Sequence, residues 1–103
     1  MAWRWVCHEA DLPDRSGLGV VVDGLHLAVF RGPSGVWALD DACAHTGAPL
    51  HRGTVEGSCL RCPWHGWRYH LATGAHLTLF GSRPGVRTWP VRVVDGEVEV
   101  DLP

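Results

Sequence analysis

The chain of 103 residues contains no lysine, so all nine of its basic residues are arginines. Eleven carboxylates oppose them and leave a formal net charge of −2. This near-neutral balance gives no electrostatic support for nucleic-acid binding. Long apolar runs are also missing, since stretches such as residues 18–22 are far too short to span a bilayer. The first nine residues show no apolar secretory signal, so we expect a cytoplasmic protein that does not associate with membranes.

The sequence also lacks long stretches with the 3.6-residue periodicity of helices. Polar and apolar residues alternate with a period of two through much of the chain, which is typical of strands. Thirteen glycines and seven prolines indicate many turns. The length suits one domain. We therefore expect a single all-β domain over residues 1–103, built from antiparallel sheets.

Two Asp-Gly pairs predict hairpins near the two ends of the chain. Asp-Gly favours the positive φ angles of a tight hairpin turn. The first pair joins predicted strands at 20–22 and 25–30, and the second joins strands at 89–94 and 97–101. The last strand should bury Val98, Val100 and Leu102. A further strand at the N-terminus should place Trp3, Trp5 and a buried Cys7 on one face.

The middle of the chain is rich in metal-binding residue types. Residues 40–85 hold five of the seven histidines and three of the four cysteines, which predicts a metal-binding unit inserted at about 40–85. Cys43-Ala44-His45 is followed, after sixteen residues, by Cys62-Pro63-Trp64-His65. Each segment supplies one thiolate and one imidazole, and nearby glycines and prolines favour loops. Two such loops facing each other would form a site with four ligands. Cys59 also precedes Cys62 by three residues, but we expect it to be a small core residue of a strand at 58–61.

These four ligands are compatible with more than one kind of metal centre. Two cysteines and two histidines can hold zinc tetrahedrally. Zinc fingers, however, usually place the cysteines together and the histidines together, whereas each segment here mixes the two. The mixed order suits a two-iron cluster in which the cysteines bind one iron and the histidines bind the other.

The full pattern resembles the Rieske [2Fe–2S] family. The likeness includes Cys-Ala-His-Thr-Gly-Ala-Pro-Leu, Cys-Pro-Trp-His-Gly-Trp-Arg-Tyr and a third segment at 81–85, where Pro84 would lie in a covering loop. It extends over nearly the whole chain, from Trp3 to Leu102. The resemblance implies the Rieske fold, with antiparallel sandwich-like or barrel-like sheets and an inserted cluster-binding subdomain. It also implies one [2Fe–2S] cluster per chain, bound by Cys43, His45, Cys62 and His65.

Residues around the expected ligands bear on the reduction potential. Rieske proteins of cytochrome bc-type complexes have a disulfide between the two loops and a serine that donates toward sulfur. By resemblance, Ala48 and Trp64 occupy the disulfide positions here, and Trp67 occupies the serine position. Tyr69 matches a retained tyrosine that can donate one hydrogen bond. Fewer donors stabilise the reduced state less, so the pattern is similar to the lower-potential ferredoxins of bacterial oxygenases. Trp64 and Trp67 would either pack in the core or form a hydrophobic collar around the cluster.

The expected function is one-electron transfer and not catalysis. The sequence shows no dinucleotide-binding glycine motif, no P-loop and no separate pair of histidines with a carboxylate for mononuclear iron. The resemblance implies a monomeric carrier that docks transiently with an NAD(P)H-dependent flavoprotein reductase and with a Rieske-type, aromatic-ring-hydroxylating oxygenase. Two alternatives are a small Rieske subunit of a nitrite-reductase-like oxidoreductase and a zinc-binding structural module.

Overall fold

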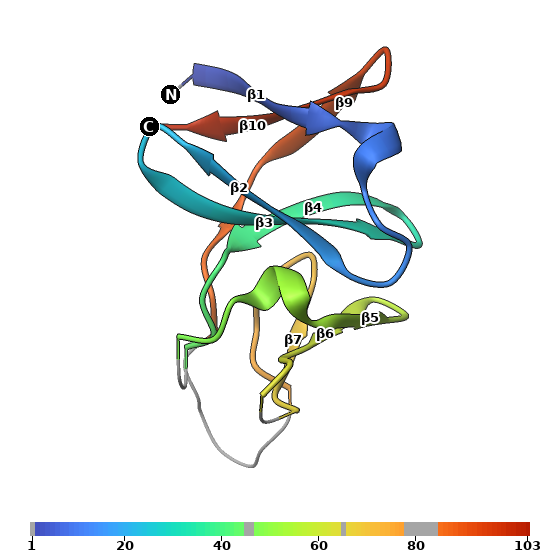
Figure 1. The fold of residues 1–103 in the computed structure, drawn as a ribbon, viewed down its shortest axis with the longest axis vertical. Coiled ribbons are helices and arrows are strands. Elements are labelled where there is room, and N and C mark those ends of the chain that lie inside the picture. The colour runs from blue at the N-terminus through green and yellow to red at the C-terminus, as the bar shows by residue number, and fades with distance from the viewer. Residues whose placement is uncertain (1, 45–46, 65, 78–84) are drawn as a thin grey trace.

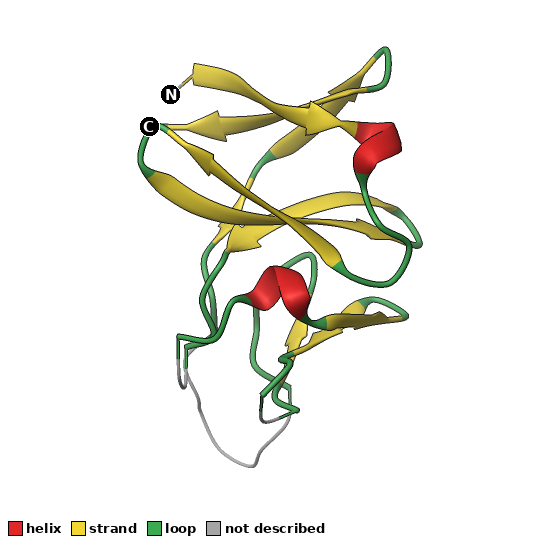
Figure 2. Ribbon diagram, viewed as in Figure 1, coloured by secondary structure: helices red, strands yellow, loops and turns green. Residues whose placement is uncertain are grey.

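A computed structural model describes residues 2–44, 47–64, 66–77 and 85–103. Strands predominate in it, with two short 3-10 turns (Figure 1, Figure 2). In chain order the elements are β1 (Ala2–His8), η1 (Glu9–Asp11), β2 (Gly17–Val22), β3 (Leu25–Gly32), β4 (Gly35–Asp40), η2 (Leu50–Arg52), β5 (Thr54–Glu56), β6 (Cys59–Arg61), β7 (Arg68–His70), β8 (Thr88–Trp89), β9 (Val91–Val94) and β10 (Glu97–Leu102). In the part of the chain that the structure describes, no helix is long and apolar enough to cross a membrane.

The strands form three antiparallel sheets, which confirms the predicted all-β class. Their orders are β1-β10-β9, β2-β3-β4-β8 and β5-β6-β7. The chain leaves the four-stranded sheet after β4 and returns to it with β8, and the third sheet is formed in between. Figure 1 shows this third sheet below the other two, along the longest dimension of a molecule that measures 40 × 27 × 19 Å.

Both Asp-Gly hairpins are present. Asp23 and Gly24 have φ angles of 51° and 79°, and Asp95 and Gly96 have φ angles of 51° and 77°. Positive φ at both central residues is the geometry that tight hairpin turns require. The registers follow, because β2 meets β3 and β9 meets β10 directly beside the turns.

The predicted strand at 89–94 is divided into two. Pro90 separates β8 from β9, and the two strands belong to different sheets. Proline has no backbone N–H to donate to a ladder, so pairing with β4 ends before it, while the Pro90 carbonyl still accepts a hydrogen bond from the Asp101 N–H of β10 (3.0 Å). The chain thereby crosses from the four-stranded sheet to the three-stranded sheet that contains β1 and β10.

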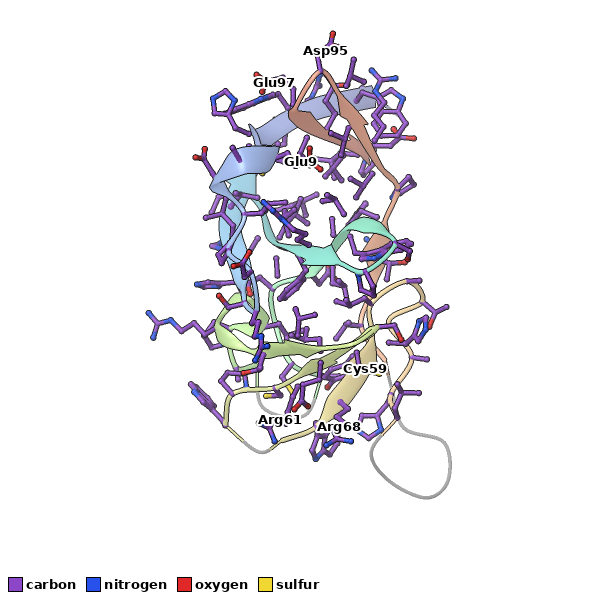
Figure 3. All side chains as sticks on the ribbon, turned by 90° about the vertical axis from the view of Figure 1, so that its right-hand side faces the viewer. Glu9, Cys59, Arg61, Arg68, Asp95 and Glu97 are labelled. Atoms are coloured by element: carbon purple, nitrogen blue, oxygen red, sulfur yellow. The ribbon has the colours of Figure 1, made fainter. Side chains whose placement is uncertain are left out.

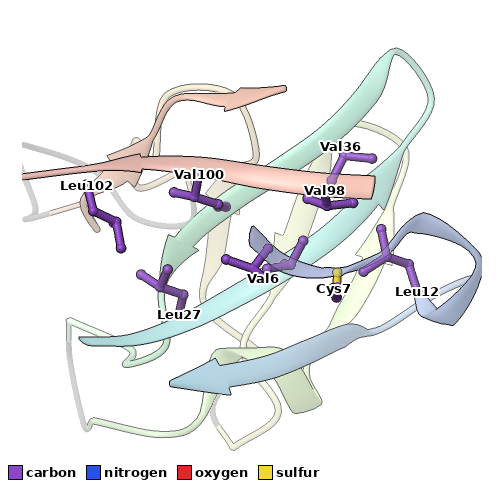
Figure 4. Packing of buried hydrophobic residues seen from close by; sticks show 10 residues of the cluster. Val6, Cys7, Leu12, Leu27, Val36, Val98, Val100 and Leu102 are labelled. Atoms are coloured by element: carbon purple, nitrogen blue, oxygen red, sulfur yellow. The ribbon is translucent and has the colours of Figure 1, made fainter. Parts of the chain in front are cut away.

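One hydrophobic core, which we call the upper core, lies between the four-stranded sheet and the sheet of β1, β10 and β9 (Figure 4). Val98, Val100 and Leu102 are buried as predicted, because successive side chains of β10 point to opposite faces. Leu27 of β3 and Val36 of β4 pack against them from the other sheet.

The prediction that Trp3, Trp5 and Cys7 share one face of β1 is wrong in part. Cys7 is buried, but Trp5 is 52% exposed and Trp3 is also exposed. The pairing of β1 with β10 shifts between Trp5 and Cys7, which marks a β-bulge. A bulge adds one residue and changes which face later side chains occupy, so Val6 and Cys7 are both buried while the tryptophans point outward.

Candidate metal centre

The two predicted cluster loops contain the same pair of backbone hydrogen bonds. In the first, the Cys43 N–H donates to the Ala48 carbonyl (2.8 Å) and the Gly47 N–H donates to the Cys43 carbonyl (2.8 Å). In the second, the Cys62 N–H donates to the Trp67 carbonyl (2.6 Å) and the Gly66 N–H donates to the Cys62 carbonyl (3.2 Å). The described residues of segments 43–48 and 62–67 therefore share one hydrogen-bond pattern, although the two segments follow different elements.

A glycine closes each of these turns. Gly47 and Gly66 have φ angles of 74° and 70°, in the left-handed region that glycine enters without steric cost. They occupy equivalent places, four residues after Cys43 and Cys62. The sequence predicted loop geometry from these glycines, and the structure supplies the reason: each turn brings the chain back beside its own cysteine.

Both cysteines lie in a second buried core, which we call the lower core. Cys43 is 3% exposed and Cys62 is 2% exposed, and they belong to one buried cluster with Leu50, Leu60 and Tyr69. His45, His65 and Pro84 lie outside the described residues. The structure thus brings the two cysteines into one apolar environment at the entrances of matching loops, which is where a shared metal centre would have its sulfur ligands. We call the end of the molecule formed by these two loops the cluster end.

Tyr69 points its hydroxyl at a cysteine sulfur. Its Oη lies 3.1 Å from Cys43 Sγ and accepts a hydrogen bond from the Ala44 N–H at 3.2 Å. Burial raises the pKa of the hydroxyl, and the hydrogen bond and charge of Cys43 raise it further. Tyr69 therefore keeps its proton and can donate it to a Cys43 thiolate. A buried donor directed at sulfur fits a thiolate-ligated cluster.

The two tryptophans of the second loop differ. Trp67 is half-buried and packs against the lower core, with its ring 4.2 Å from the His76 ring in an edge-on arrangement. Trp64 is 60% exposed. The core interpretation suits Trp67, whereas Trp64 presents an apolar surface at the cluster end.

A pair that sequence reasoning missed ties the base of the first loop. The Asp41 carboxylate accepts a hydrogen bond from the His51 N–H (2.8 Å), and its other oxygen lies 2.7 Å from His51 Nδ1. Asp41 precedes Cys43 by two residues, and His51 lies in η2. The His51 ring packs over Gly19, where a Cβ would come within 2.8 Å of it. The Gly17-Leu18-Gly19 pattern, directly before the predicted strand at 20–22, was the available signal, since glycine in a strand often marks a close approach.

The remaining cysteines are not part of this arrangement. Cys59 is only partly buried on β6, so the prediction of a core residue is wrong for it. Leu60 fills the core instead, because neighbouring side chains of a strand alternate between faces. Cys7 lies in the upper core, where burial, with smaller contributions from the charges of Asp11 and Glu97, raises the pKa of its thiol to about 11. Such a thiol stays neutral and unreactive near neutral pH.

Comparison with known proteins decides the family. The model of the Rieske [2Fe-2S] domain matches residues 2–90. The chain belongs to the Rieske [2Fe–2S] domain family. This Rieske domain therefore carries a [2Fe–2S] cluster, and the family match favours iron and sulfide over zinc. When bound, the cluster accepts or releases one electron.

Three relatives show how far the likeness extends. This Rieske protein is 31% identical to the ferredoxin component of the naphthalene 1,2-dioxygenase system of Pseudomonas aeruginosa, over 99% of both chains. Its fold matches a ferredoxin of Sphingomonas yanoikuyae B1 with a TM-score of 0.87 and 31% identity, covering 99% and 100% of the two chains. It also matches a protein described as an NADPH nitrite reductase small subunit, with a TM-score of 0.84 and 26% identity, covering 99% and 100%.

Proposed function

We propose that this Rieske protein is a one-electron carrier of an oxygenase system. It would accept an electron from an NAD(P)H-dependent flavoprotein reductase and pass it to a Rieske-type, aromatic-ring-hydroxylating oxygenase. The supporting observation is the match to a dioxygenase ferredoxin component over 99% of both chains. Such a relative is an electron-transfer component.

We propose Cys43, His45, Cys62 and His65 as the ligands, with both cysteines on one iron and both histidines on the other. The supports are the matching turns of loops 43–48 and 62–67 and the burial of both cysteines. Residues 40–85 would then be the cluster-binding subdomain of a single domain spanning 1–103. Pro84 would cover the cluster from the third segment.

The shape of the molecule supports transient docking by a monomer. The two loops lie at one end of the longest dimension (Figure 1), and Trp64 is exposed there. A carrier needs its cluster close to the surface and a contact that partners can enter and leave. The remainder of the chain, with its own upper core, would serve as the scaffold.

Chemical analysis and turnover test this function. Protein purified without air should contain two irons and two acid-labile sulfides per chain, and dithionite should produce an EPR signal that the oxidised protein lacks. NADH-dependent turnover by an oxygenase and reductase encoded beside this gene should require the carrier. Cys43→Ser should lose the cluster and support no turnover, whereas the matched control Cys59→Ser should retain both. One zinc and no labile sulfide would refute the proposal.

A second candidate is a subunit that stays bound to a larger oxidoreductase. The observation that favours it is the fold match to the protein described as a nitrite reductase small subunit. Gel filtration of the native protein separates the two possibilities. A carrier elutes as a small protein free of partners, whereas a resident subunit elutes with a large chain at fixed stoichiometry.

A further inference from the structure

Two arginines face each other at the base of the second cluster loop. β6 ends at Arg61 and β7 begins at Arg68, and these two residues are partners across the antiparallel ladder. Their side chains are 46% and 54% exposed. The Arg61 side chain runs beside the loop, because its Cδ lies 3.9 Å from the position that a Cβ on Gly66 would occupy. Figure 3 shows both arginines at the cluster end of the molecule.

The facing arginines repel each other electrostatically. Like charges directly opposite each other on two strands are destabilising. Glu56 is placed between the two, with its Oε1 3.7 Å from Arg61 Nε and 3.8 Å from Arg68 Nε. One exposed carboxylate shared by two guanidinium groups leaves a net positive charge, and exposed pairs at such distances are weak. The two guanidinium groups and the carboxylate together have a net formal charge of +1 on exposed side chains, which is complementary to an external anionic surface.

The charges of the whole chain are divided in the same direction. Residues 40–85, the predicted cluster-binding subdomain, contain four arginines and three carboxylates, a net formal charge of +1, whereas the rest contains five arginines and eight carboxylates, a net of −3. Figure 3 shows Glu9, Asp95 and Glu97 at the end opposite Arg61 and Arg68. A cluster with two thiolates and two neutral imidazoles has a formal charge of zero, or −1 after it takes up one electron. Negative charge is therefore concentrated away from the cluster end, where Arg61, Arg68 and Glu56 together have a net formal charge of +1.

Trp64 adds an apolar contact to this positive surface. It lies in the six-residue loop that Arg61 and Arg68 flank, and it is 60% exposed. Tryptophan and arginine are the residue types most enriched at the centres of protein interfaces. An exposed tryptophan flanked by arginines indicates a docking surface for a protein and not a solvated loop.

We propose that Arg61, Arg68 and Trp64 form a cationic docking surface that recognises a redox partner through a carboxylate-rich face around the partner's own electron-transfer site. This inference rests on the proposed carrier function and specifies the chemistry of its partner. Complementary charge would orient the carrier with its cluster end forward and would raise the association rate, an effect that salt weakens. A protein partner is favoured over nucleic acid, because nucleic-acid binding usually neutralises several more phosphates than this surface can contact.

Two double variants separate local charge from net charge. Arg61→Gln/Arg68→Gln removes two positive charges at the cluster end, and Arg4→Gln/Arg92→Gln removes two at the opposite end. All four arginines lie beside carboxylates: Arg4 beside Asp23 and Arg92 beside Glu99, whereas Arg61 and Arg68 share Glu56. Arg61→Lys/Arg68→Lys keeps the charge and should behave as wild type. The visible spectrum of each variant verifies an intact cluster before comparison.

The first measurement does not depend on electron transfer. On a sulfopropyl cation-exchange resin at pH 7.5 and low ionic strength, the wild type should be retained despite its net charge of −2. The Arg4/Arg92 variant should also be retained, whereas the Arg61/Arg68 variant should flow through. Wild-type protein that flows through, or equal loss of retention in both variants, would overturn the proposal.

The second measurement probes the surface through which electrons leave. Dithionite-reduced protein, freed of dithionite, is oxidised by hexacyanoferrate(III), an anion, or by hexaamminecobalt(III), a cation; each complex takes one electron. We expect the rate with the anion to fall as salt increases and the rate with the cation to rise. At low ionic strength, the Arg61/Arg68 variant should react with the anion about fivefold more slowly, with the Arg4/Arg92 variant unchanged. The opposite salt dependence in the wild type would overturn the proposal.

Two controls distinguish the other outcomes. Titration with a 20-base-pair duplex DNA should leave the wild type unbound, and binding that the Arg61/Arg68 variant loses would assign the surface to nucleic acid instead. Failure of the wild type to support oxygenase turnover, with the resin and oxidant results as expected, would refute the proposed function and leave the cationic surface standing. Normal turnover that is insensitive to salt and to Arg61→Gln/Arg68→Gln would retain the function and refute the docking surface.

Discussion

The hydroxyl of Tyr69 is a side-chain group that can adjust the electron affinity of the centre. It lies 3.1 Å from Cys43 Sγ, and its bond strengthens when the sulfur gains negative charge on reduction. We expect Tyr69→Phe to lower the midpoint potential by about 45 mV, which corresponds to about 1 kcal/mol for one electron. Protein-film voltammetry measures the shift. The phenyl ring preserves the packing, so an unchanged potential would show that the hydroxyl does not donate to the sulfur.

Cys7 gives the upper core a defined response to alkali. Its folded-state pKa of about 11 exceeds the ordinary value of 9.0, so the unfolded chain loses its proton first as pH rises. The free energy of unfolding should therefore be unaffected below about pH 9 and fall by roughly 2 kcal/mol as pH approaches 11. Denaturant titration of the wild type and of Cys7→Ala measures this as a difference. Parallel curves for the two proteins across this range would contradict it.

At the scale of elements, η2 is fixed by a contact between His51 and strand β2. Gly19→Ala places a methyl group within 2.8 Å of the His51 ring and should destabilise the protein by about 1–2 kcal/mol. The same substitution in a His51→Ala background should cost less, because the ring is gone. A double-mutant cycle by chemical denaturation gives the coupling. Additive effects would mean that the ring and β2 are independent.

The hairpins were predictable because their information is local. Asp23-Gly24 and Asp95-Gly96 determine turn geometry by themselves, and alternation in β10 then determines which side chains are buried. The bulge in β1 was not predictable, because it depends on pairing with a strand from the other end of the chain. The division at Pro90 was available in the sequence, since proline ends a ladder, but the transfer to a second sheet depends on tertiary packing.

The candidate site shows the same distinction between local and long-range information. The spacing of residue types was sufficient to indicate Cys43 and Cys62. The tyrosine donor was indicated only by the resemblance to the family. The repeated turn follows from glycines at equivalent positions and was accessible in principle. The Asp41–His51 pair and the facing arginines were not, because each requires the relative placement of two segments.

At the scale of the whole molecule, the two cores predict unequal dependence on the cluster. The lower core contains Cys43 and Cys62, whereas the upper core contains neither. Because metal binding also stabilises the fold around it, removal of iron should loosen the lower core first. Hydrogen exchange of the apoprotein should show faster exchange in β5, β6 and β7, with β3 and β10 still protected. Uniform loss of protection in all sheets would show that the cores unfold as one unit.

The pairing of β1 with β10 has a practical consequence for attachment. Ala2 lies opposite Leu102, so the two ends of the described chain emerge side by side, away from the loops (Figure 1). A peptide linker fused at either end would therefore leave the cysteine loops unobstructed. Protein immobilised on an electrode through such a linker would face its redox centre toward solution, and direct current from the metal surface would be weak until a soluble mediator is added.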